Sequence, residues 1–280
     1  MSTIPAEAVK QLRERTNLPM MKCKEALTRA GGDMQKAIDL LRAEEKGLEV
    51  KFGGREATEG RIAVFIDAAK GVAAILEMRC ESAPVAKSDP FIKMTNDLVQ
   101  LVAEKDPKTP EELAGLTGSG GKLGSELVSE VMALIRENMK VHRFVRLTGG
   151  HFGSYVHHDG SVGVLVQASG DKGDPALLKD VSMHVTAYVP TPVAARRDEV
   201  AAEVIAKETE IAMAKAVATG KPANIAEMIA VGQMKTWYAD HVLIEQPFVK
   251  DPSKTVGQLF ASAGLEVVKF VRYKVGEIVA

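Results

Sequence analysis

The chain has 280 residues, 46% of them hydrophobic, and its 36 Lys plus Arg against 37 Asp plus Glu give a formal net charge of −1 at pH 7. The length predicts one large domain or two to three smaller ones, and the hydrophobic content excludes wholesale disorder and a fibrous repeat. The charge balance lacks the basic excess that a phosphate-binding surface needs, so we expect no direct nucleic-acid partner.

The cysteines and the N-terminal residues indicate a cytoplasmic protein. Cys23 and Cys80 are the only cysteines and lie far apart, which gives no disulfide framework. The opening segment MSTIPAEAVKQLRERT has no apolar stretch of the kind found in secretory signals. No run in the sequence reaches the roughly 18 apolar residues of a membrane span, so we expect no membrane association.

The first fifty residues predict three short helices. Pro5 suits the first turn of a helix, a second helix begins at Met20, and a third begins near Met34. Glycines separate the second from the third, and the third fades in a charged stretch. We therefore predict a small three-helix bundle over 1–50 and a polar linker over 51–59.

From residue 60 the hydrophobic pattern changes to that of strands. The pattern predicts a hairpin, two helices and a further strand, over residues 61–67 (RIAVFID), 72–81 (VAAILEMRCE), 91–103, 126–138 and 143–147. These elements make up a predicted core subdomain N over 60–148.

A similar order of elements returns later in the chain. A second hairpin, a helix and a final strand are predicted over residues 155–158, 162–168 (VGVLVQA), 176–187 and 266–273. Two β-β-α units of similar length indicate an internal duplication. We predict a core subdomain C over 149–190 and 240–280, so that the fold class is α+β.

Between the two parts of core subdomain C, the sequence predicts an inserted antiparallel helical hairpin over 191–239. The residues expected to share the apolar faces of its two helices are Val200, Val204, Ile211, Ala214 and Ala218, and Ile225, Met228, Ile229 and Gly232. The hairpin is interpreted as a dimerisation arm, an effector surface or a solvated projection.

Three groups of residues are candidates for sites of chemistry. The Gly-rich stretch 115–124 departs from a phosphate-binding loop at Leu116 and Leu123, which favours a flexible linker. His157 and His158 with Asp159 suggest a metal site, but adjacent residues of a strand point to opposite faces, which favours a turn with exposed imidazoles.

Cys23 and Cys80 have no histidine nearby in sequence and are predicted to be buried structural thiols. Since no acid–base pair, nucleophile triad or metal-ligand spacing is evident, we predict no catalytic residue, no metal and no cofactor. The protein is expected to act by contact, without covalent chemistry.

Met20 and Met21 open the second helix of the bundle. One interpretation places both in the core. The other holds that so small a bundle cannot bury both neighbours, which leaves one as an adaptable apolar contact for a partner.

Four segments in order resemble the translation elongation factor Ts family. The first is the run LRERTNLPMMKCKEAL at 12–27, and the second begins at EMRCE (77–81) and continues through VAK (85–87) to Phe91. The others are GSYVH (153–157) with GVLV (163–166), and PFV (247–249) with PSKTVG (252–257). The resemblance covers essentially the whole chain.

The resemblance implies a guanine-nucleotide exchange factor for elongation factor Tu, with the GDP-bound GTPase as partner. It implies that the N-terminal bundle is ubiquitin-associated-like and contacts the GTPase through Met20 and Met21. It also implies that the segment Ser82, Ala83, Pro84 and Val85 disturbs the Mg²⁺ and phosphate region, and that His157 is a core contact on the other side of the nucleotide.

Two departures from the family pattern leave alternatives open. Members usually carry Thr-Asp-Phe-Val where this chain has Ser82–Val85, so the carboxylate and the aromatic wedge are absent. One alternative is therefore a GTPase-binding chaperone or assembly subunit with weak or no exchange, and a further one is an enzyme that uses Cys80 or the His157–His158 pair. The family often continues past the last strand with a helical module, and we expect that contact to be missing here.

Overall fold

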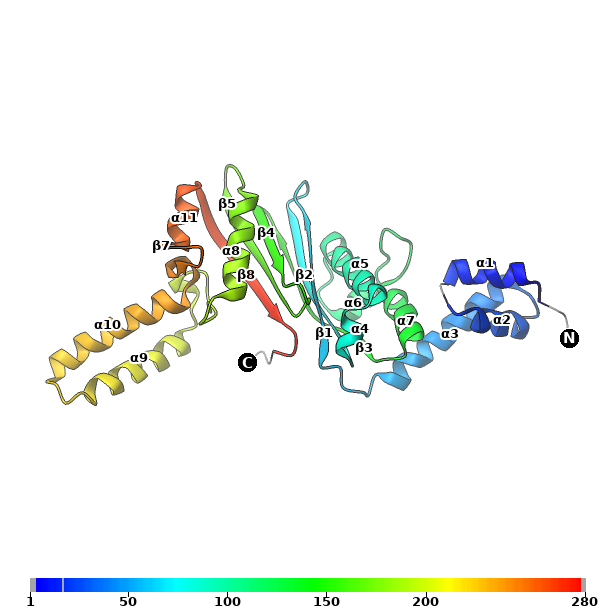
Figure 1. Cartoon of the computed structure of the whole chain (residues 1–280), viewed down its shortest axis with the longest axis horizontal. Coiled ribbons are helices and arrows are strands. Elements are labelled where there is room, and N and C mark those ends of the chain that lie inside the picture. Colours follow the sequence, from blue (N-terminus) through cyan, green and yellow to red (C-terminus); the bar gives the residue numbers. More distant parts are fainter. Residues whose placement is uncertain (1–3, 17, 278–280) are drawn as a thin grey trace.

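The computed structural model describes residues 4–16 and 18–277, with the main chain alone for residue 42 and residues 45–50. The chain end at 278–280, within the predicted core subdomain C, lies outside the described residues. The molecule is elongated, with a small helical bundle at one end, a long helical hairpin at the other and two small sheets between them (Figure 1). The α+β class predicted from the sequence is confirmed.

The N-terminal bundle has a small apolar core. Its helices are α1 (Ala6–Thr16), α2 (Met20–Arg29) and α3 (Met34–Phe52). The core residues include Leu12, Cys23 and Leu27, and Ala133 of the neighbouring subdomain joins them. A bundle of this size buries little apolar surface by itself, so this contact adds to its stability.

Helix α3 is longer than the sequence indicated. The predicted linker over 51–59 begins inside this helix, because α3 continues to Phe52, which is buried in the core of the next subdomain. Glu and Lys are good helix formers, so the charged stretch extends the helix and does not end it. Burial of the Phe52 ring then stabilises the last turn.

The first sheet contains the hairpin predicted from the sequence. It has the strand order β1-β2-β3, all antiparallel, formed by β1 (Glu59–Asp67), β2 (Val72–Cys80) and β3 (Met139–Thr148). The helices of this part are α4 (Ala83–Ala86), α5 (Asp89–Lys105), α6 (Pro110–Gly115) and α7 (Gly124–Ile135). Helix α5 packs on β1 and β2, which places Phe91, Leu98 and Val102 in the core.

The second sheet has an equivalent order. It is β4-β5-β8, formed by β4 (His151–Val156), β5 (Val162–Gly170) and β8 (Leu265–Lys274). Helix α8 (Pro175–Ala187) packs on β4 and β5, and α11 (Val256–Ser262) packs on β8. In both sheets a hairpin precedes a helix, and a third strand pairs with the second strand of the hairpin. The internal duplication itself stays a prediction.

The two sheets face each other, with helices on their outer sides (Figure 1). Side chains between the sheets include Ile62, Ile75 and Leu165. The middle strands β2 and β5 are therefore covered on both faces, which explains why their sequences are almost continuously apolar.

The helical hairpin consists of α9 (Ala202–Val217) and α10 (Ala223–His241). The predicted apolar faces were mostly wrong: the buried seam is formed by Ala212, Ala216, Ala226 and Ala230, with the predicted Ile229 packed against it, while Val204, Ile225 and Met228 are exposed. Alanines allow the two helix axes to approach closely, so most of the larger aliphatic residues lie at the edge of the seam or outside it.

The base of the hairpin joins it to the second sheet. It contains the 3-10 helices η1 (Arg197–Glu199) and η2 (Leu243–Glu245) and the short strands β6 (Pro247–Phe248) and β7 (Asp251–Thr255). Val200, predicted on the helix stripe, is instead buried here with Ala194 and Val242.

The Gly-rich stretch is a folded loop and not an open linker. Thr117 and Leu123 form an isolated antiparallel bridge, and Gly124 donates its N–H to the Leu116 carbonyl. A Cβ on Gly124 would lie 2.3 Å from the carbonyl oxygen of Leu113. Glycine is therefore required at this position for close packing against the chain at Leu113.

Candidate partner-binding site

The segment Ser82–Val85, here called the 82–85 loop, follows β2: Ser82 is the N-cap residue of α4, and Ala83, Pro84 and Val85 form the first turn of that short helix. Ala83 and Pro84 are exposed, while Val85 is half-buried against the core of the first subdomain. The backbone N–H and the hydroxyl of Ser82 donate to the two carboxylate oxygens of Glu137, over 3.1 and 2.7 Å. The loop thus presents a small apolar tip on a polar, fixed base.

Cys80 supports this base through a hydrogen bond. Its Sγ donates to the Ser82 carbonyl oxygen over 3.3 Å. Burial, with a smaller contribution from the Glu137 carboxylate, raises the pKa of the Cys80 thiol to about 12. The thiol is therefore protonated at neutral pH and acts as a weak donor. Cys23 is also buried, so both predictions of buried thiols are confirmed.

His157 lies in the turn that joins β4 to β5. The hydroxyl of Tyr155 is 3.5 Å from His157 Nδ1, and the His157 and His158 ring centroids are 4.3 Å apart. The predicted turn is confirmed, because β4 ends at Val156, but the strand predicted over 155–158 is shorter than expected and the two rings lie side by side. His157 is half-buried and His158 is exposed.

The carboxylate of Asp159 accepts hydrogen bonds within the same turn. Its Oδ1 accepts from the N–H and the hydroxyl of Ser161, and the backbone hydrogen bond is the main reason that the pKa of Asp159 is lowered. Among the described residues, no group of three or more His, Cys, Asp or Glu side chains could hold a metal ion.

Strand β1 brings the 82–85 loop and the His157 turn to one region, although 75 positions separate Ser82 from His157 in the sequence. Glu59 at the start of β1 pairs with Cys80, and Ile62 donates its N–H to the Gly160 carbonyl over 2.8 Å. Three residues of strand span about 10 Å. The 82–85 loop and the His157 turn are therefore both connected to the first four residues of β1.

Met20 and Met21 lie elsewhere, on the bundle at the far end of α3 (Figure 1). Both are exposed, with relative accessibilities of 46% and 74%, so neither is a core residue. Cys23 of the same helix points inward and donates to the Leu18 carbonyl. The structure therefore does not bring the methionines together with the 82–85 loop.

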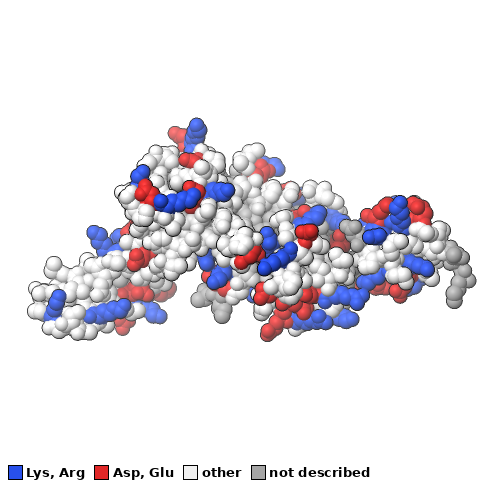
Figure 2. All heavy atoms as spheres, in the orientation of Figure 1, with Lys and Arg blue, Asp and Glu red and all other residues white. Residues whose placement is uncertain are grey.

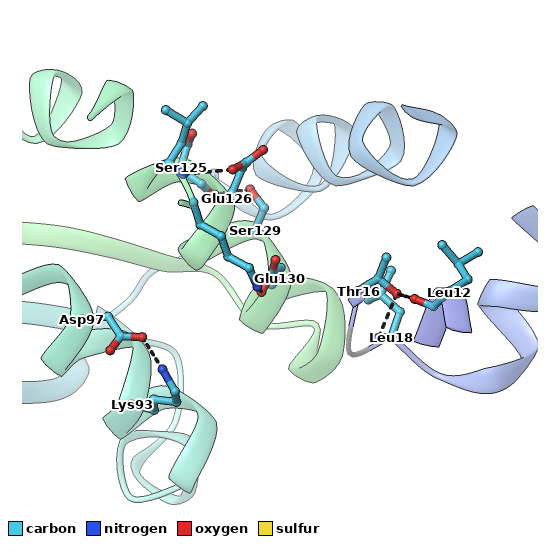
Figure 3. A network of polar contacts seen from close by, with 11 residues as sticks. Leu12, Thr16, Leu18, Lys93, Asp97, Ser125, Glu126, Ser129 and Glu130 are labelled. Carbon is cyan, nitrogen blue, oxygen red and sulfur yellow. Dashed lines mark hydrogen bonds and ion pairs between the residues drawn. The ribbon is translucent and has the colours of Figure 1, made fainter. Parts of the chain in front are cut away.

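A cavity of about 770 Å³ lies between α5, the Gly-rich loop, α7 and Thr16 of α1. Its rim carries the ion pairs Lys93–Asp97 (2.5 Å) and Lys122–Glu130 (2.6 Å). Figure 3 shows Lys93 and Asp97 on one helix, Glu130 on the next, and Thr16 on the bundle beyond. None of the predicted site residues lines this cavity.

The surface charges agree with the near-zero net charge. Figure 2 shows Lys and Arg interspersed with Asp and Glu on the face in view, with no continuous basic tract there. Within the part of the chain that the structure describes, none of the helices combines the length and hydropathy that a membrane span requires.

The residues that hold the 82–85 loop were not among those predicted from the sequence. Glu137 and Asn138 follow the end of α7, and Glu81 contacts Asn138 across 57 positions of sequence. The Glu-Asn dipeptide after a helix carries no local signal for this role, because its partners come from a different part of the chain.

Comparison with known proteins gives a consistent result. A family model described as elongation factor TS matches residues 81–277. The chain is 43% identical over 277 residues to elongation factor Ts of Methylococcus capsulatus, covering 98% of this chain and 93% of that protein. It is 41% identical over 278 residues to elongation factor Ts of Thioalkalivibrio sulfidiphilus, with 98% and 93% covered. For elongation factor Ts of Azoarcus sp. the identity is 40% over 278 residues, with 99% and 92% covered.

Proposed function

The chain belongs to the elongation factor Ts family of translation elongation factors, and from this premise we propose that it is a guanine-nucleotide exchange factor for elongation factor Tu. It acts by binding, without covalent chemistry, in the cytoplasm where translation takes place. A partner that binds the nucleotide-free GTPase more tightly than the GDP-bound form must weaken GDP binding by the same factor.

The observation that carries the proposal is the 82–85 loop, whose exposed Ala83 and Pro84 stand on a base held by Glu137. In this proposal the loop enters the Mg²⁺ and phosphate region of the GTPase. Ala83 has no carboxylate to compete for the metal shell, so the loop acts by bulk. Proline keeps φ near −65°, which gives the tip a restricted shape.

His157 is the second proposed contact, on the other side of the nucleotide site. It is half-buried, its ring centroid lies 4.3 Å from that of His158, and its turn contacts β1 through the hydrogen bond from Ile62 N–H to the Gly160 carbonyl. With the aromatic wedge absent, exchange relies more on this contact. His157→Ala is expected to slow GDP release, and exposed His158→Ala serves as the adjacent control.

The test of the function is release of a fluorescent GDP analogue from the cognate GTPase in a stopped-flow instrument. The release rate is expected to rise with the concentration of this chain and to saturate. A stable complex that retains GDP would contradict exchange and would support the chaperone or assembly role instead. No acceleration and no complex would contradict both.

The role of the altered loop has a separate test. The triple variant Ser82→Thr, Ala83→Asp, Pro84→Phe restores the usual family residues. It is expected to increase the maximal release rate if the GTPase keeps its usual surface. An unchanged or lower rate would mean that the partners are adapted to the Ser-Ala-Pro loop, or that the loop does not reach the nucleotide.

Met20 and Met21 are proposed as the contact of the bundle with the GTPase. Both side chains are exposed at the start of α2, and methionine adapts its shape to an apolar partner surface. Met21→Lys is expected to weaken the complex, whereas Lys22→Met on the same turn is the control for a change of charge. Equal affinities for Met21→Lys and the parent chain would contradict this contact.

We further propose that the helical hairpin forms a homodimer. On α10, the exposed Met228 and Val231 lie on the side opposite the buried Ala226 and Ala230, given 100° of rotation per residue. A free apolar face of this kind suits a second copy of the chain. Sedimentation of Met228→Lys with Val231→Lys is expected to show a monomer, and a dimer in both proteins would exclude this face.

A further inference from the structure

Two consecutive residues after α7 hold two consecutive residues after β2. Glu137 accepts two hydrogen bonds from Ser82, and Glu81 Oε1 accepts from the backbone N–H of Asn138 over 2.6 Å. Asn138 is buried, with a relative accessibility of 3%. Hydrogen bonds to carboxylates are stronger than those between neutral groups, so this reciprocal pairing, here called the clamp, fixes the base of the 82–85 loop.

Every backbone polar atom of Ser82 has a partner. Its N–H donates to Glu137, and its carbonyl oxygen accepts from the Cys80 thiol and from the Ala86 N–H over 3.3 and 3.2 Å. The latter bond closes the first turn of α4. Ser82 is therefore held from both directions of the chain, while the next two residues are exposed.

A third segment joins the clamp from the side of the bundle. Asn138 Nδ2 donates to the Arg55 carbonyl over 2.6 Å, and Arg55 also pairs with Glu81 at 3.4 Å. The guanidinium of Arg55 lies over the ring of Phe52, the last residue of α3, with 4.6 Å from Cζ to the ring centroid. The clamp thus connects the ends of α3, β2 and α7.

From this geometry we infer that Glu137 is a positioning residue for nucleotide exchange, acting through Ser82. The inference rests on the proposed function. A loop that lacks a carboxylate and an aromatic wedge can displace the nucleotide-binding region of the GTPase only if the loop keeps its conformation on contact. Holding Ser82 in advance removes the ordering cost from the step in which GDP leaves. The clamp therefore contributes to the rate of release more than to the affinity of the complex.

The experiment uses the full chain and the cognate GTPase loaded with fluorescent GDP. Ser82→Ala and Glu137→Gln are each expected to lower the maximal release rate about tenfold, the size of a lost hydrogen bond to a charged group. The concentration of chain that gives half of the maximal rate should change by less than about threefold, as expected for an interaction used in the transition state. The double variant should be no slower than Glu137→Gln alone, since both changes break one interaction.

Two variants separate positioning from general stability. Ser82→Thr keeps the hydroxyl donor to Glu137 and is expected to lose less of the release rate than Ser82→Ala. Glu130→Gln makes the same change of side chain on α7, where the carboxylate pairs with Lys122 instead, and is expected to leave exchange unaffected.

The outcomes distinguish this inference from the proposed function. If the parent chain accelerates release and Ser82→Ala or Glu137→Gln keeps the full rate, the positioning role is overturned. A loss in Ser82→Thr or Glu130→Gln equal to that in Ser82→Ala would also overturn it, since the effect would then be one of stability. If the parent chain does not accelerate release, the proposed function fails and this inference fails with it.

Discussion

Arg143 donates from Nε to Glu77 Oε2 over 2.6 Å, and this pair across β2 and β3 also connects the two sheets. Glu77 is fully buried, and its other oxygen accepts from Arg79 Nε over 2.8 Å. The Arg143 guanidinium lies over the ring of Tyr273 on β8, 4.1 Å from Cζ to the centroid. Burial raises the pKa of Tyr273 to about 12, so the ring is neutral beneath the cation.

Arg143→Leu is expected to lower the free energy of unfolding by about 3 kcal/mol, because it removes one partner of a buried pair together with the contact to Tyr273. Urea unfolding followed by circular dichroism measures the change. Lys140→Leu, at an exposed position of the same strand, is the control and should alter stability little. Equal transitions for the two variants would show that the pair does not hold the sheets together.

His184 makes the base of the hairpin sensitive to pH. It is buried, its Nδ1 accepts from the Val249 N–H over 3.2 Å, and its Nε2 lies 3.0 Å from Gln246 Oε1. This arrangement requires the neutral ring with the proton on Nε2. Burial lowers the pKa of His184 below its ordinary value, and the hydrogen bond to Gln246 opposes the shift in part.

Because the unfolded chain binds a proton at about pH 6.5, it takes up more protons than the folded chain just below that pH. The stability from His184 is therefore complete above pH 6.5 and is lost as the pH falls, by at most about 1.4 kcal/mol per pH unit. Urea unfolding between pH 5 and 8 should show this slope, and His184→Gln should reduce it. His158→Gln, at an exposed position, should leave the slope unchanged; the opposite result would assign the slope elsewhere.

Gly153 is required for the packing of α8 on the second sheet. A Cβ at this position would lie 2.4 Å from Leu178 Cβ and 2.6 Å from the Leu178 carbonyl carbon. Gly153→Ala is expected to destabilise the fold by about 2 kcal/mol, since a backbone atom would have to move. Thermal unfolding measures the change.

Gly232 is the matched control for this substitution. It lies within α10, and a Cβ there would meet nothing within 4 Å. Gly232→Ala is expected to stabilise the hairpin by about 0.5–1 kcal/mol, because alanine loses less backbone entropy in a helix. A loss of stability in Gly232→Ala, or none in Gly153→Ala, would contradict the packing described here.

Both cysteines are expected to be unreactive in the folded protein. Cys23 and Cys80 are buried, and the pKa of Cys80 is raised to about 12. A disulfide reagent at pH 8 should modify both thiols in urea and neither in buffer, because burial blocks access to both in the folded protein. Rapid modification of Cys80 in buffer would reopen the interpretation of this residue as a nucleophile.

Most helices and strands of the two core subdomains, and their order along the chain, were predictable from the local hydrophobic pattern. The runs RIAVFID and VAAILEMRCE gave a hairpin because strand residues alternate or run continuously apolar between turn signals. The buried cysteines were also predicted, whereas the sequence left open whether both Met20 and Met21 are buried or one is exposed, and the structure exposes both. The seam of the hairpin did not, since alanines carry a weak hydrophobic signal and the larger aliphatic residues beside them suggested the wrong face.

The sequence alone determined the fold class, the family and the absence of the usual Asp-Phe wedge, because each depends on residue identity and on periodicity along the chain. Only the tertiary structure decided how the 82–85 loop is held. Ser82 contacts Glu137 across 55 positions, and Asn138 contacts Arg55 across 83. Hydrogen bonds of this kind depend on the directions in which α3, β2 and α7 end, and those directions are set by the packing of the whole core.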